Sequence, residues 1–259
     1  MTASDARVAV VTGASRGVGK GIARALAAAG YHVYATGRTV TSDPAEPRLV
    51  AMPFDITDDR AVADCFARVA ADHGRLDVLV NSAWGGYEQM VEDGTFTWAV
   101  PFWQQPAWRW DKMLTVGVRA AFIASQHAAR LMLPAKRGLI VHLSSWPAQK
   151  HIGNVPYGVS KAATDKLAAD MAHELGPHGI HVVSLYPGLV RTEAVLAAGV
   201  FDLSNSESPD FIGRTIAALA DGKSAAHNGQ VVVAAAFARD HGITDVDGRQ
   251  PQPLTLRDV

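Results

Sequence analysis

The chain has 259 residues, of which 24 are basic and 25 acidic, so its formal net charge is −1. This balance excludes the strongly basic surface that is typical of nucleic-acid-binding proteins and of polybasic membrane anchors. The single cysteine, Cys65, excludes a disulfide framework and a multi-cysteine metal site, and it favours a reducing, cytoplasmic location. We find no apolar run as long as the ~18 residues of a membrane-spanning helix, so no membrane association is expected.

Short β-branched runs alternate with alanine- and leucine-rich segments of helical period along the whole chain. This alternation predicts a doubly wound α/β fold, with a parallel sheet between two layers of helices. The predicted strands are Val8–Thr12, His32–Thr36, Leu49–Pro53, Leu76–Val80, Leu139–Leu143, His181–Leu185 and Gln230–Val233. The predicted helices are Val18–Ala29, Asp58–Asp72, Trp108–Leu133, Tyr157–Leu175 and Ser208–Ala220. Because the sequence contains no linker and no repeat, we expect residues 1–259 to form a single Rossmann-type domain with about seven strands.

The segment between the second and third predicted strands is short for a parallel crossover. Its central part, residues 39–48, includes Pro44 and Pro47. A parallel crossover normally takes about a dozen residues, usually as a helix, and proline disfavours a helix there. We therefore expect the second crossover helix to be shortened or absent.

Residues 84–110 form an aromatic-rich insertion that holds five of the six tryptophans. The insertion leaves the carboxyl end of the fourth predicted strand, where open α/β sheets bind their ligands. We interpret Trp98, Phe102 and Trp103, joined by Trp146, as the wall of an apolar substrate pocket. The alternative is that these aromatic side chains pack on one another or against a partner subunit and stabilise only the loop.

A glycine-rich turn follows the first predicted strand and leads directly into a helix. Its sequence is Thr12-Gly13-Ala14-Ser15-Arg16-Gly17-Val18-Gly19. Glycine lets the backbone approach a pyrophosphate closely, and the free N–H groups of the following helix then meet the negative charge. The turn therefore predicts a dinucleotide-binding site, although glycines can also serve a tight turn alone.

The spacing T-G-x-x-x-G-x-G resembles that of the short-chain dehydrogenase/reductase family, and further matches follow in order along nearly the whole chain. Asp55, in Phe54-Asp55-Ile56, resembles the family's adenine-contacting aspartate. Asn81-Ser82-Ala83-Trp84 resembles its N-N-A-G motif, with two of the four letters changed. Pro187-Gly188 resembles the start of the loop that covers the nicotinamide, with Val190 and Thr192 at the carboxamide-contacting positions. The resemblance implies a nicotinamide cofactor and a substrate loop over residues 189–210.

The choice between the two nicotinamide cofactors depends on charge. The second predicted strand and the residues after it read Ala35-Thr36-Gly37-Arg38. Family members that use NAD resemble one another in an acidic residue here, which binds the ribose hydroxyls, and this sequence has no such residue. Arg38 and Arg16 can instead surround a 2′-phosphate, which a guanidinium group binds well. Either arginine by itself could also be a solvated surface charge. Together they predict a preference for NADP(H) over NAD(H).

Tyr157 and Lys161 open a helix with a spacing of four residues, which places them on one helix face. A nearby cation favours the phenolate form of a tyrosine, whose ordinary pKa is about 10. A serine is expected about a dozen residues earlier, and Ser144 and Ser145 follow the fifth predicted strand. By its position, the second serine of this pair resembles the family's catalytic serine. Ser145 is therefore the candidate, and Ser144 is the alternative. The resemblance thus implies catalysis by Ser145, Tyr157 and Lys161.

One family residue, an asparagine in the long helix before the fifth strand, is replaced here by Gly117. A glycine inside a helix costs about 1 kcal/mol relative to alanine, so close packing or room for a water is expected at this position. The replacement puts the family's water relay to Lys161 in question. A nucleotide-binding regulatory or structural protein with little turnover therefore remains an alternative, as does an epimerase or dehydratase on the same scaffold.

The leading hypothesis is an NADP(H)-dependent oxidoreductase that transfers a hydride between the nicotinamide and a carbonyl or secondary alcohol of an apolar small molecule. Segments 102–111, 154–170 and 245–249 resemble one animal group of the family that also carries the helix glycine, and this implies a carbonyl reductase. No histidine pair has the spacing of a helical zinc motif, so no metal is expected. Small residues on the two longest helices and the resemblance imply a homodimer or homotetramer. The residues expected to bind the cofactor are Gly13, Ser15, Arg16, Gly17, Val18, Gly19, Arg38, Asp55, Ile56, Asn81, Ala83, Tyr157, Lys161, Pro187, Gly188, Val190 and Thr192.

Overall fold

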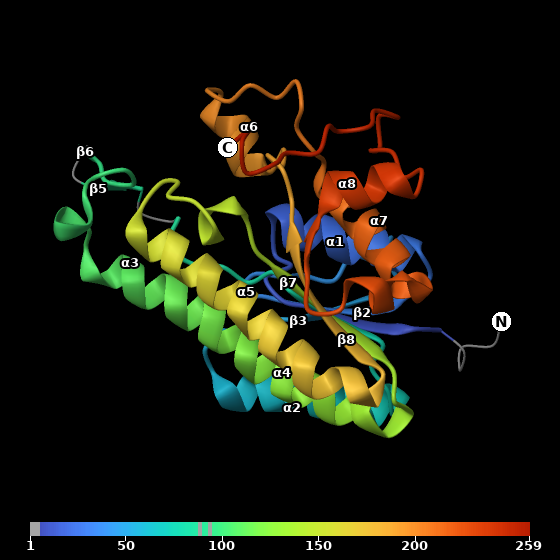
Figure 1. The fold of residues 1–259 in the computed structure, drawn as a ribbon. Coiled ribbons are helices and arrows are strands. Elements are labelled where there is room, and N and C mark those ends of the chain that lie inside the picture. The colour runs from blue at the N-terminus through green and yellow to red at the C-terminus, as the bar shows by residue number, and fades with distance from the viewer. Residues whose placement is uncertain (1–5, 88–89, 93–94) are drawn as a thin grey trace.

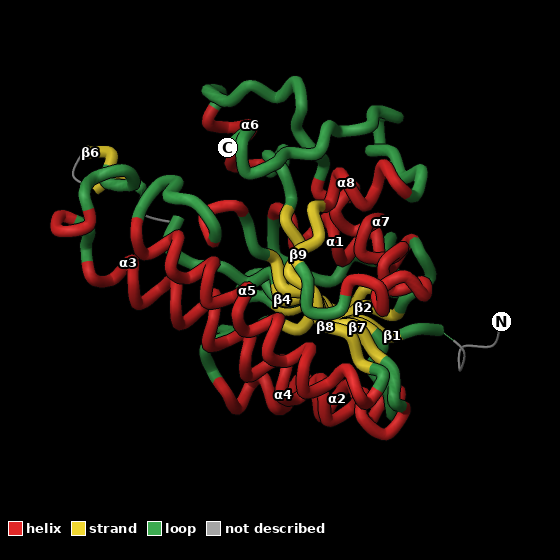
Figure 2. Tube along the Cα trace, viewed as in Figure 1, coloured by secondary structure: helices red, strands yellow, loops and turns green. Residues whose placement is uncertain are grey.

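A twisted parallel sheet forms the centre of the computed structural model, which describes residues 6–87, 90–92 and 95–259 (Figures 1 and 2). Its seven strands have the order β3-β2-β1-β4-β7-β8-β9, and every pairing is parallel. The strands are β1 (Val8–Val11), β2 (His32–Thr36), β3 (Leu49–Met52), β4 (Val78–Asn81), β7 (Gly138–Leu143), β8 (Ile180–Tyr186) and β9 (Val231–Val233). The predicted Rossmann-type sheet is confirmed. Its order reverses between β1 and β4, the position where such sheets bind ligands.

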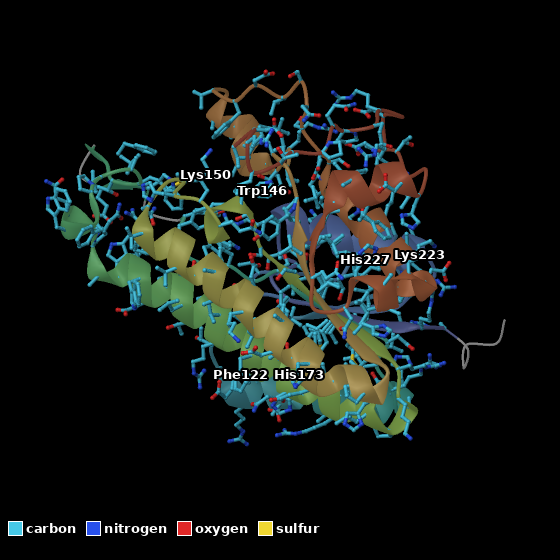
Figure 3. The ribbon with its side chains drawn as sticks, viewed as in Figure 1. Phe122, Trp146, Lys150, His173, Lys223 and His227 are labelled. Carbon is cyan, nitrogen blue, oxygen red and sulfur yellow. The ribbon has the colours of Figure 1, made fainter. Side chains whose placement is uncertain are left out.

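Helices cover both faces of the sheet, and each layer has its own apolar core. One face carries α1 (Gly17–Ala28), α7 (Pro209–Ala218) and α8 (Ala234–Asp240), packed on alternate strand residues such as Val11 and Val33. The opposite face carries α2 (Asp59–His73), α4 (Ala120–Met132) and α5 (Val155–Leu175). The exposed side chains Phe122 and His173 lie on this second layer (Figure 3). Parallel strands buried on both faces explain the continuous apolar runs in the sequence.

The connection between β2 and β3 contains no helix among residues 37–48, as the short proline-containing segment predicts. Its last residue before the strand, Arg48, donates a hydrogen bond to the carbonyl of Gly30 at 3.0 Å. The side chain of Glu46 also forms an ion pair with Arg24 of α1 at 2.6 Å. The segment is therefore fastened to α1 rather than to a crossover helix of its own.

The long helix predicted over Trp108–Leu133 consists of three parts. The chain forms α3 (Ala107–Lys112), then a π-helical segment η3 (Met113–Arg119), and then α4. A π-helical turn holds an extra residue and locally widens the helix, and such turns occur frequently at functional sites. Gly117 lies within this widened part.

Several short elements were not predicted. They are α6 (Glu193–Ala198), α8, and the antiparallel hairpin of β5 (Val91–Glu92) and β6 (Thr95–Phe96). Single helical turns are η2 (Phe102–Gln104), η4 (Leu133–Ala135), η5 (Trp146–Ala148), η6 (Gly176–His178) and η8 (Ser224–His227), and η7 (Leu219–Lys223) is π-helical. Among the described residues, no helix combines the length and the apolar character needed to cross a membrane.

Candidate active site

The carboxyl ends of the neighbouring strands β4, β7 and β8 meet around a cavity of about 220 Å³. Residues at and after these strand ends line it together with residues of α5 and η3. The lining residues that bear on chemistry are Ser145, Tyr157, Lys161, Trp84, His142 and Gly188. The fold therefore brings the three predicted catalytic residues into one cavity.

The hydroxyl groups of Ser145 and Tyr157 lie 3.1 Å apart, within hydrogen-bond distance. Ser145 is the second residue after β7, whereas Tyr157 lies in the first turn of α5. The N-cap of that helix, Asn154, accepts a hydrogen bond from the Tyr157 N–H at 2.9 Å. The hydroxyl of Ser144 is instead directed to the main chain, where it donates to the carbonyl of Lys161 at 3.3 Å. Of the two serines, Ser145 is thus the one whose hydroxyl meets Tyr157.

Lys161 lies one helical turn beyond Tyr157 and is almost fully buried, with 7 % of its surface exposed. Its ammonium group donates a hydrogen bond to the main-chain carbonyl of Leu143 at 3.1 Å. Burial lowers the pKa of Lys161 to about 7, and the neighbouring Asp165 opposes this effect. Burial therefore works against the charged form of this side chain.

Aromatic rings surround the Tyr157 ring on several sides. Its centroid is 5.6 Å from that of Trp84, 6.0 Å from Tyr87 and 5.3 Å from Trp98. Trp98 thus occupies the predicted place beside Tyr157. Trp146, by contrast, packs edge-on against Tyr186, with the ring centroids 5.2 Å apart.

The expected pocket-wall positions of Phe102 and Trp103 are wrong. These side chains are 63 % and 72 % exposed, and their rings contact each other with centroids 5.3 Å apart. Proline at position 101 starts η2 here, and this turn carries both rings on the surface. The alternative of mutual packing therefore describes this pair, whereas Trp98 faces the cavity residue Tyr157.

The buried guanidinium of Arg109 holds the aromatic segment, and the sequence analysis missed it. Arg109 is fully buried and donates to the carbonyl of Thr97 at 2.9 Å and to the side chain of Gln105. Gln105 in turn donates to the carbonyls of Trp98 and Val100, at 3.1 and 2.8 Å. The available sequence signal was an arginine within an aromatic stretch. If such an arginine is buried, it needs several hydrogen-bond acceptors around it. The network fixes the main chain that carries Trp98.

The glycine turn has the close approach that a pyrophosphate site requires. A Cβ atom on Gly13 would lie 2.6 Å from the Cα of Ala83, and one on Gly19 would lie 2.3 Å from the carbonyl oxygen of Gly13. The N–H of Gly17, in the first turn of α1, donates to the carboxylate of Glu193 at 2.9 Å. A carboxylate at this position shows that the turn accepts an anionic oxygen. These observations fit the phosphate groups of a dinucleotide.

The predicted adenosine-side residues cluster at the ends of β1, β2 and β3. Arg16 and Arg38 are both exposed. The pKa of Asp55 is lowered mainly by hydrogen bonds from Thr57 and, to a smaller extent, by the nearby charge of Arg38. The Ser15 hydroxyl accepts a hydrogen bond from the N–H of Thr39 at 3.3 Å, which ties the glycine turn to the loop after β2. The two arginines are thus available at the same end of the sheet.

The other predicted cofactor residues divide between the cavity and the apolar cores. Asn81 and Ala83 line the cavity, and the buried side-chain amide of Asn81 donates to the Ser125 hydroxyl at 3.0 Å. Val190 is 8 % exposed and belongs to the core on the α1 face, and Ile56 packs against the opposite core. Val18 lines the cavity, and the N–H of Ala83 donates to the Thr12 hydroxyl at 3.1 Å.

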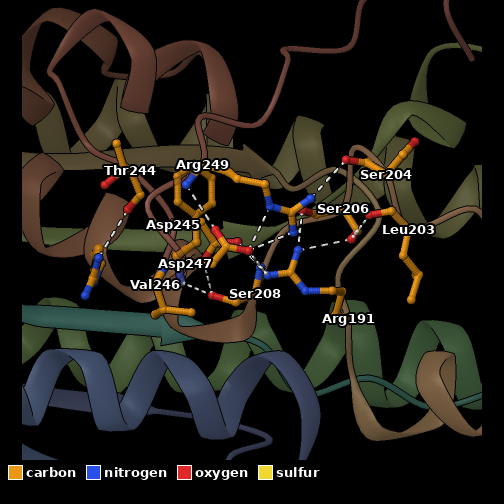
Figure 4. Close-up of polar contacts among 12 residues, drawn as sticks. Arg191, Leu203, Ser204, Ser206, Ser208, Thr244, Asp245, Val246, Asp247 and Arg249 are labelled. Atoms are coloured by element: carbon orange, nitrogen blue, oxygen red, sulfur yellow. Dashed lines mark hydrogen bonds and ion pairs between the residues drawn. The ribbon is translucent and has the colours of Figure 1, made fainter.

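The substrate loop is anchored at its two ends to the C-terminal region (Figure 4). Arg191 forms an ion pair with the buried Asp245 at 2.9 Å, and Asp245 also accepts from the N–H of Ser208 at 2.8 Å. Thr192 caps α6 by accepting from the N–H of Val195. Gly188, whose N–H donates to Glu207 at 2.9 Å, lines the cavity together with Pro187. Asp245 therefore closes the base of the loop that sequence reasoning placed beside the nicotinamide.

Comparison with known proteins agrees with this site. A family model described as short chain dehydrogenase matches residues 7–199. The chain is 42 % identical over 267 residues to mouse (Mus musculus) dehydrogenase/reductase SDR family member 1, covering 94 % of this chain and 84 % of that protein. It is 40 % identical to the human protein of that name, covering 98 % of this chain and 88 % of that one.

A solved structure of another short-chain dehydrogenase/reductase has the same fold. A mutant of a Serratia marcescens short-chain dehydrogenase/reductase superposes with a TM-score of 0.72 at 28 % identity, covering 88 % of this chain and 95 % of that one. The member 1 proteins are the animal group that the three sequence segments resemble, and that resemblance is confirmed. The chain belongs to the short-chain dehydrogenase/reductase family of oxidoreductases.

Proposed function

We propose that the protein is an NADP(H)-dependent oxidoreductase that interconverts apolar carbonyl compounds and their alcohols. The observation that carries this proposal is the 3.1 Å contact between the hydroxyls of Ser145 and Tyr157, in a cavity that also holds Lys161. A proton donor and a second hydroxyl at one point can bind and protonate a single carbonyl oxygen.

The residues divide the chemistry among them. When bound, the nicotinamide cofactor supplies or accepts the hydride. Ser145 donates a hydrogen bond to the substrate oxygen, and Tyr157 gives that oxygen its proton in the reductive direction. Lys161 lies with its ammonium nitrogen 5.9 Å from the Tyr157 ring centroid, and its charge stabilises the phenolate that remains. Its ammonium group is also available to the cofactor ribose.

The preference for NADP(H) is supported by charge at the end of β2. Thr36 ends this strand, and Arg38 follows in place of an acidic residue. Arg16 lies in the glycine turn next to Ser15. The Ser15 hydroxyl accepts a hydrogen bond from the N–H of Thr39, which follows Arg38, so the two loops that carry the arginines are joined. Two exposed guanidinium groups at adjoining loops suit the double negative charge of a 2′-phosphate.

The apolar substrate class is supported by the rings beside Tyr157. Tyr87 and Trp98 contact each other, with centroids 5.2 Å apart, and both contact Tyr157. The hydroxyl of Tyr87 is uncharged at neutral pH, because the ordinary pKa of a tyrosine is about 10. A wall of neutral aromatic groups favours a substrate with apolar substituents over a sugar or a hydroxy acid.

The test is turnover of NADPH, followed through the absorbance of the reduced nicotinamide, with bulky apolar and small polar carbonyl compounds. We expect NADPH-dependent reduction with a higher kcat/KM for the bulky compounds. Trp98→Ala should raise KM for bulky substrates, whereas Trp103→Ala, at a 72 % exposed position, is the matched control. Binding of NADPH without turnover of any compound would favour the nucleotide-binding regulatory function instead.

A further inference from the structure

The Trp84 ring is close to both Gly117 and the catalytic candidate Lys161. A Cβ atom on Gly117 would lie 2.6 and 2.8 Å from two carbons of the Trp84 six-membered ring, closer than such atoms can approach. The ammonium nitrogen of Lys161 is 3.8 Å from the centroid of the Trp84 ring. Only glycine at position 117 leaves room for the ring in this place.

The ammonium group of Lys161 has few other partners. Within the described part of the chain, its hydrogen bond goes to the Leu143 carbonyl. The titratable groups near it are Tyr157 and Asp165 on α5 and His142 on β7, with Tyr87 across the cavity. Asp165 already accepts a hydrogen bond from the Tyr186 hydroxyl. Burial lowers the pKa of His142 to about 4, so that His142 adds no charge at neutral pH.

An aromatic face attracts a desolvated cation through its quadrupole, and tryptophan is the most effective ring. Contacts with three residues hold the Trp84 ring in this position. It packs against Gly117 on one side, contacts Tyr157 with the centroids 5.6 Å apart, and touches Tyr87 with the centroids 5.9 Å apart. The ring thus meets both ends of the Tyr157–Lys161 pair.

We propose that Trp84, seated on Gly117, is a positioning residue that holds the Lys161 ammonium group charged and in place through a cation–π contact. The inference deepens the proposed function, because it assigns the support of Lys161 in the same site. It also joins two departures from the family pattern, Trp84 after β4 and Gly117 in η3, into one packing arrangement. The π-helical turn provides the backbone on which this arrangement rests.

The direct test is the pKa of Lys161 in the ligand-free protein, measured by NMR titration with 13C-labelled lysine; Lys161→Met assigns the signal among the seven lysines. Trp84→Leu removes the quadrupole, and we expect it to lower the pKa of Lys161 by about one unit. Trp84→Phe, which keeps a ring, should restore most of the difference. Trp103→Leu, at an exposed position, should leave the pKa unchanged.

If Trp84 only excluded water from Lys161, the pKa of Lys161 would change in the opposite direction. The smaller leucine would admit solvent and so raise this pKa. A raised or unchanged pKa in Trp84→Leu therefore overturns the inference. This measurement needs no substrate, so it can succeed or fail independently of the proposed function. In an active enzyme, Trp84→Leu should also move the alkaline limb of the kcat/KM profile to lower pH, and Trp84→Phe should not.

A second measurement tests the seat of the ring. Gly117→Ala should lower Tm in the natural background, where the new methyl group meets the Trp84 ring. In a Trp84→Ala background the same change should raise Tm, because alanine is the better helix former. A Gly117→Ala effect of equal sign and size in both backgrounds contradicts the packing of Trp84 on Gly117.

Discussion

The side-chain amide of Asn154 donates a hydrogen bond to the main-chain carbonyl of Trp98 at 3.0 Å. The amide oxygen of the same residue accepts the N–H of Tyr157 and thereby caps α5. One buried side chain therefore fixes the aromatic segment relative to the proton donor. The distance between Trp98 and Tyr157, and with it the width of the apolar wall, depends on this contact.

Replacement of Asn154 separates its two roles. Asn154→Ser keeps an N-cap oxygen but cannot reach Trp98, whereas Asn154→Ala loses both contacts. We expect thermal unfolding to show a loss of about 1 kcal/mol for serine, from the contact with Trp98, and about 1 kcal/mol more for alanine, which also loses the cap. Both variants should raise KM for bulky carbonyl compounds. Unchanged KM in both, with the stability loss present, would show that Asn154 serves only as a helix cap.

Arg38→Asp tests the choice of cofactor. The change removes a guanidinium group and places a like charge near the 2′-phosphate, so NADPH binding should weaken by roughly 2–3 kcal/mol. NADH binding should change little or improve. Fluorescence titration with each cofactor measures both. Arg60→Asp, at an exposed position on α2, is a matched control that should leave both affinities as they are. Equal losses for NADPH and NADH in Arg38→Asp would assign Arg38 to the fold.

Glu207 predicts a pH dependence of stability. It is 2 % exposed, and burial raises its pKa from 4.5 to about 7, although the Gly188 N–H opposes this effect. A carboxyl group with a raised folded-state pKa contributes stability that is present below the unfolded-state pKa and is lost as the pH rises through about 7.

Glu207→Gln should therefore stabilise the protein at pH 8, by on the order of 3 kcal/mol or several degrees in Tm, because the buried carboxylate is removed. At pH 4 the variant and the natural protein should unfold at similar temperatures. Glu174→Gln, at an exposed position, should have no effect at either pH. A gain in Tm that is the same at both pH values would contradict this account of Glu207.

The exposed apolar face of α4 and α5 predicts assembly. Phe122 and Val159 are each 41 % exposed, and we expect these two helices to pair across a two-fold axis, as the family resemblance implies. Phe122→Glu should shift sedimentation from a dimer or tetramer toward the 27.5 kDa species. Phe102→Glu, on the aromatic segment, should leave assembly unchanged. A natural protein that already sediments at 27.5 kDa would refute the predicted assembly.

The features that the sequence predicted well are those set by local chemistry. The strand His32–Thr36 has the predicted bounds, and the prolines in residues 39–48 predicted the missing crossover helix. The glycine turn was identifiable because close approach requires glycine at Gly13 and Gly19. The spacing of Tyr157 and Lys161 predicted one helix face, and both line the cavity.

The features that escaped prediction depend on contacts between distant segments. Nothing in the local sequence indicates that Asp245 binds Arg191, 54 residues away. Phe102 and Trp103 have the composition of a pocket wall, but the turn that carries them lies on the surface. Gly117 was identified as unusual, yet its explanation requires the position of the Trp84 ring.

The most direct test of the proposed chemistry is the rate of NADPH consumption with a bulky apolar ketone in two variants of one cavity. Tyr157→Phe and Tyr87→Phe each remove one hydroxyl, and both residues line the site. We predict that Tyr157→Phe abolishes turnover while NADPH affinity stays nearly unchanged, and that Tyr87→Phe keeps most of the rate. If Tyr157→Phe retains more than about a tenth of kcat, a barrier change of only ~1.4 kcal/mol, Tyr157 is not the proton donor.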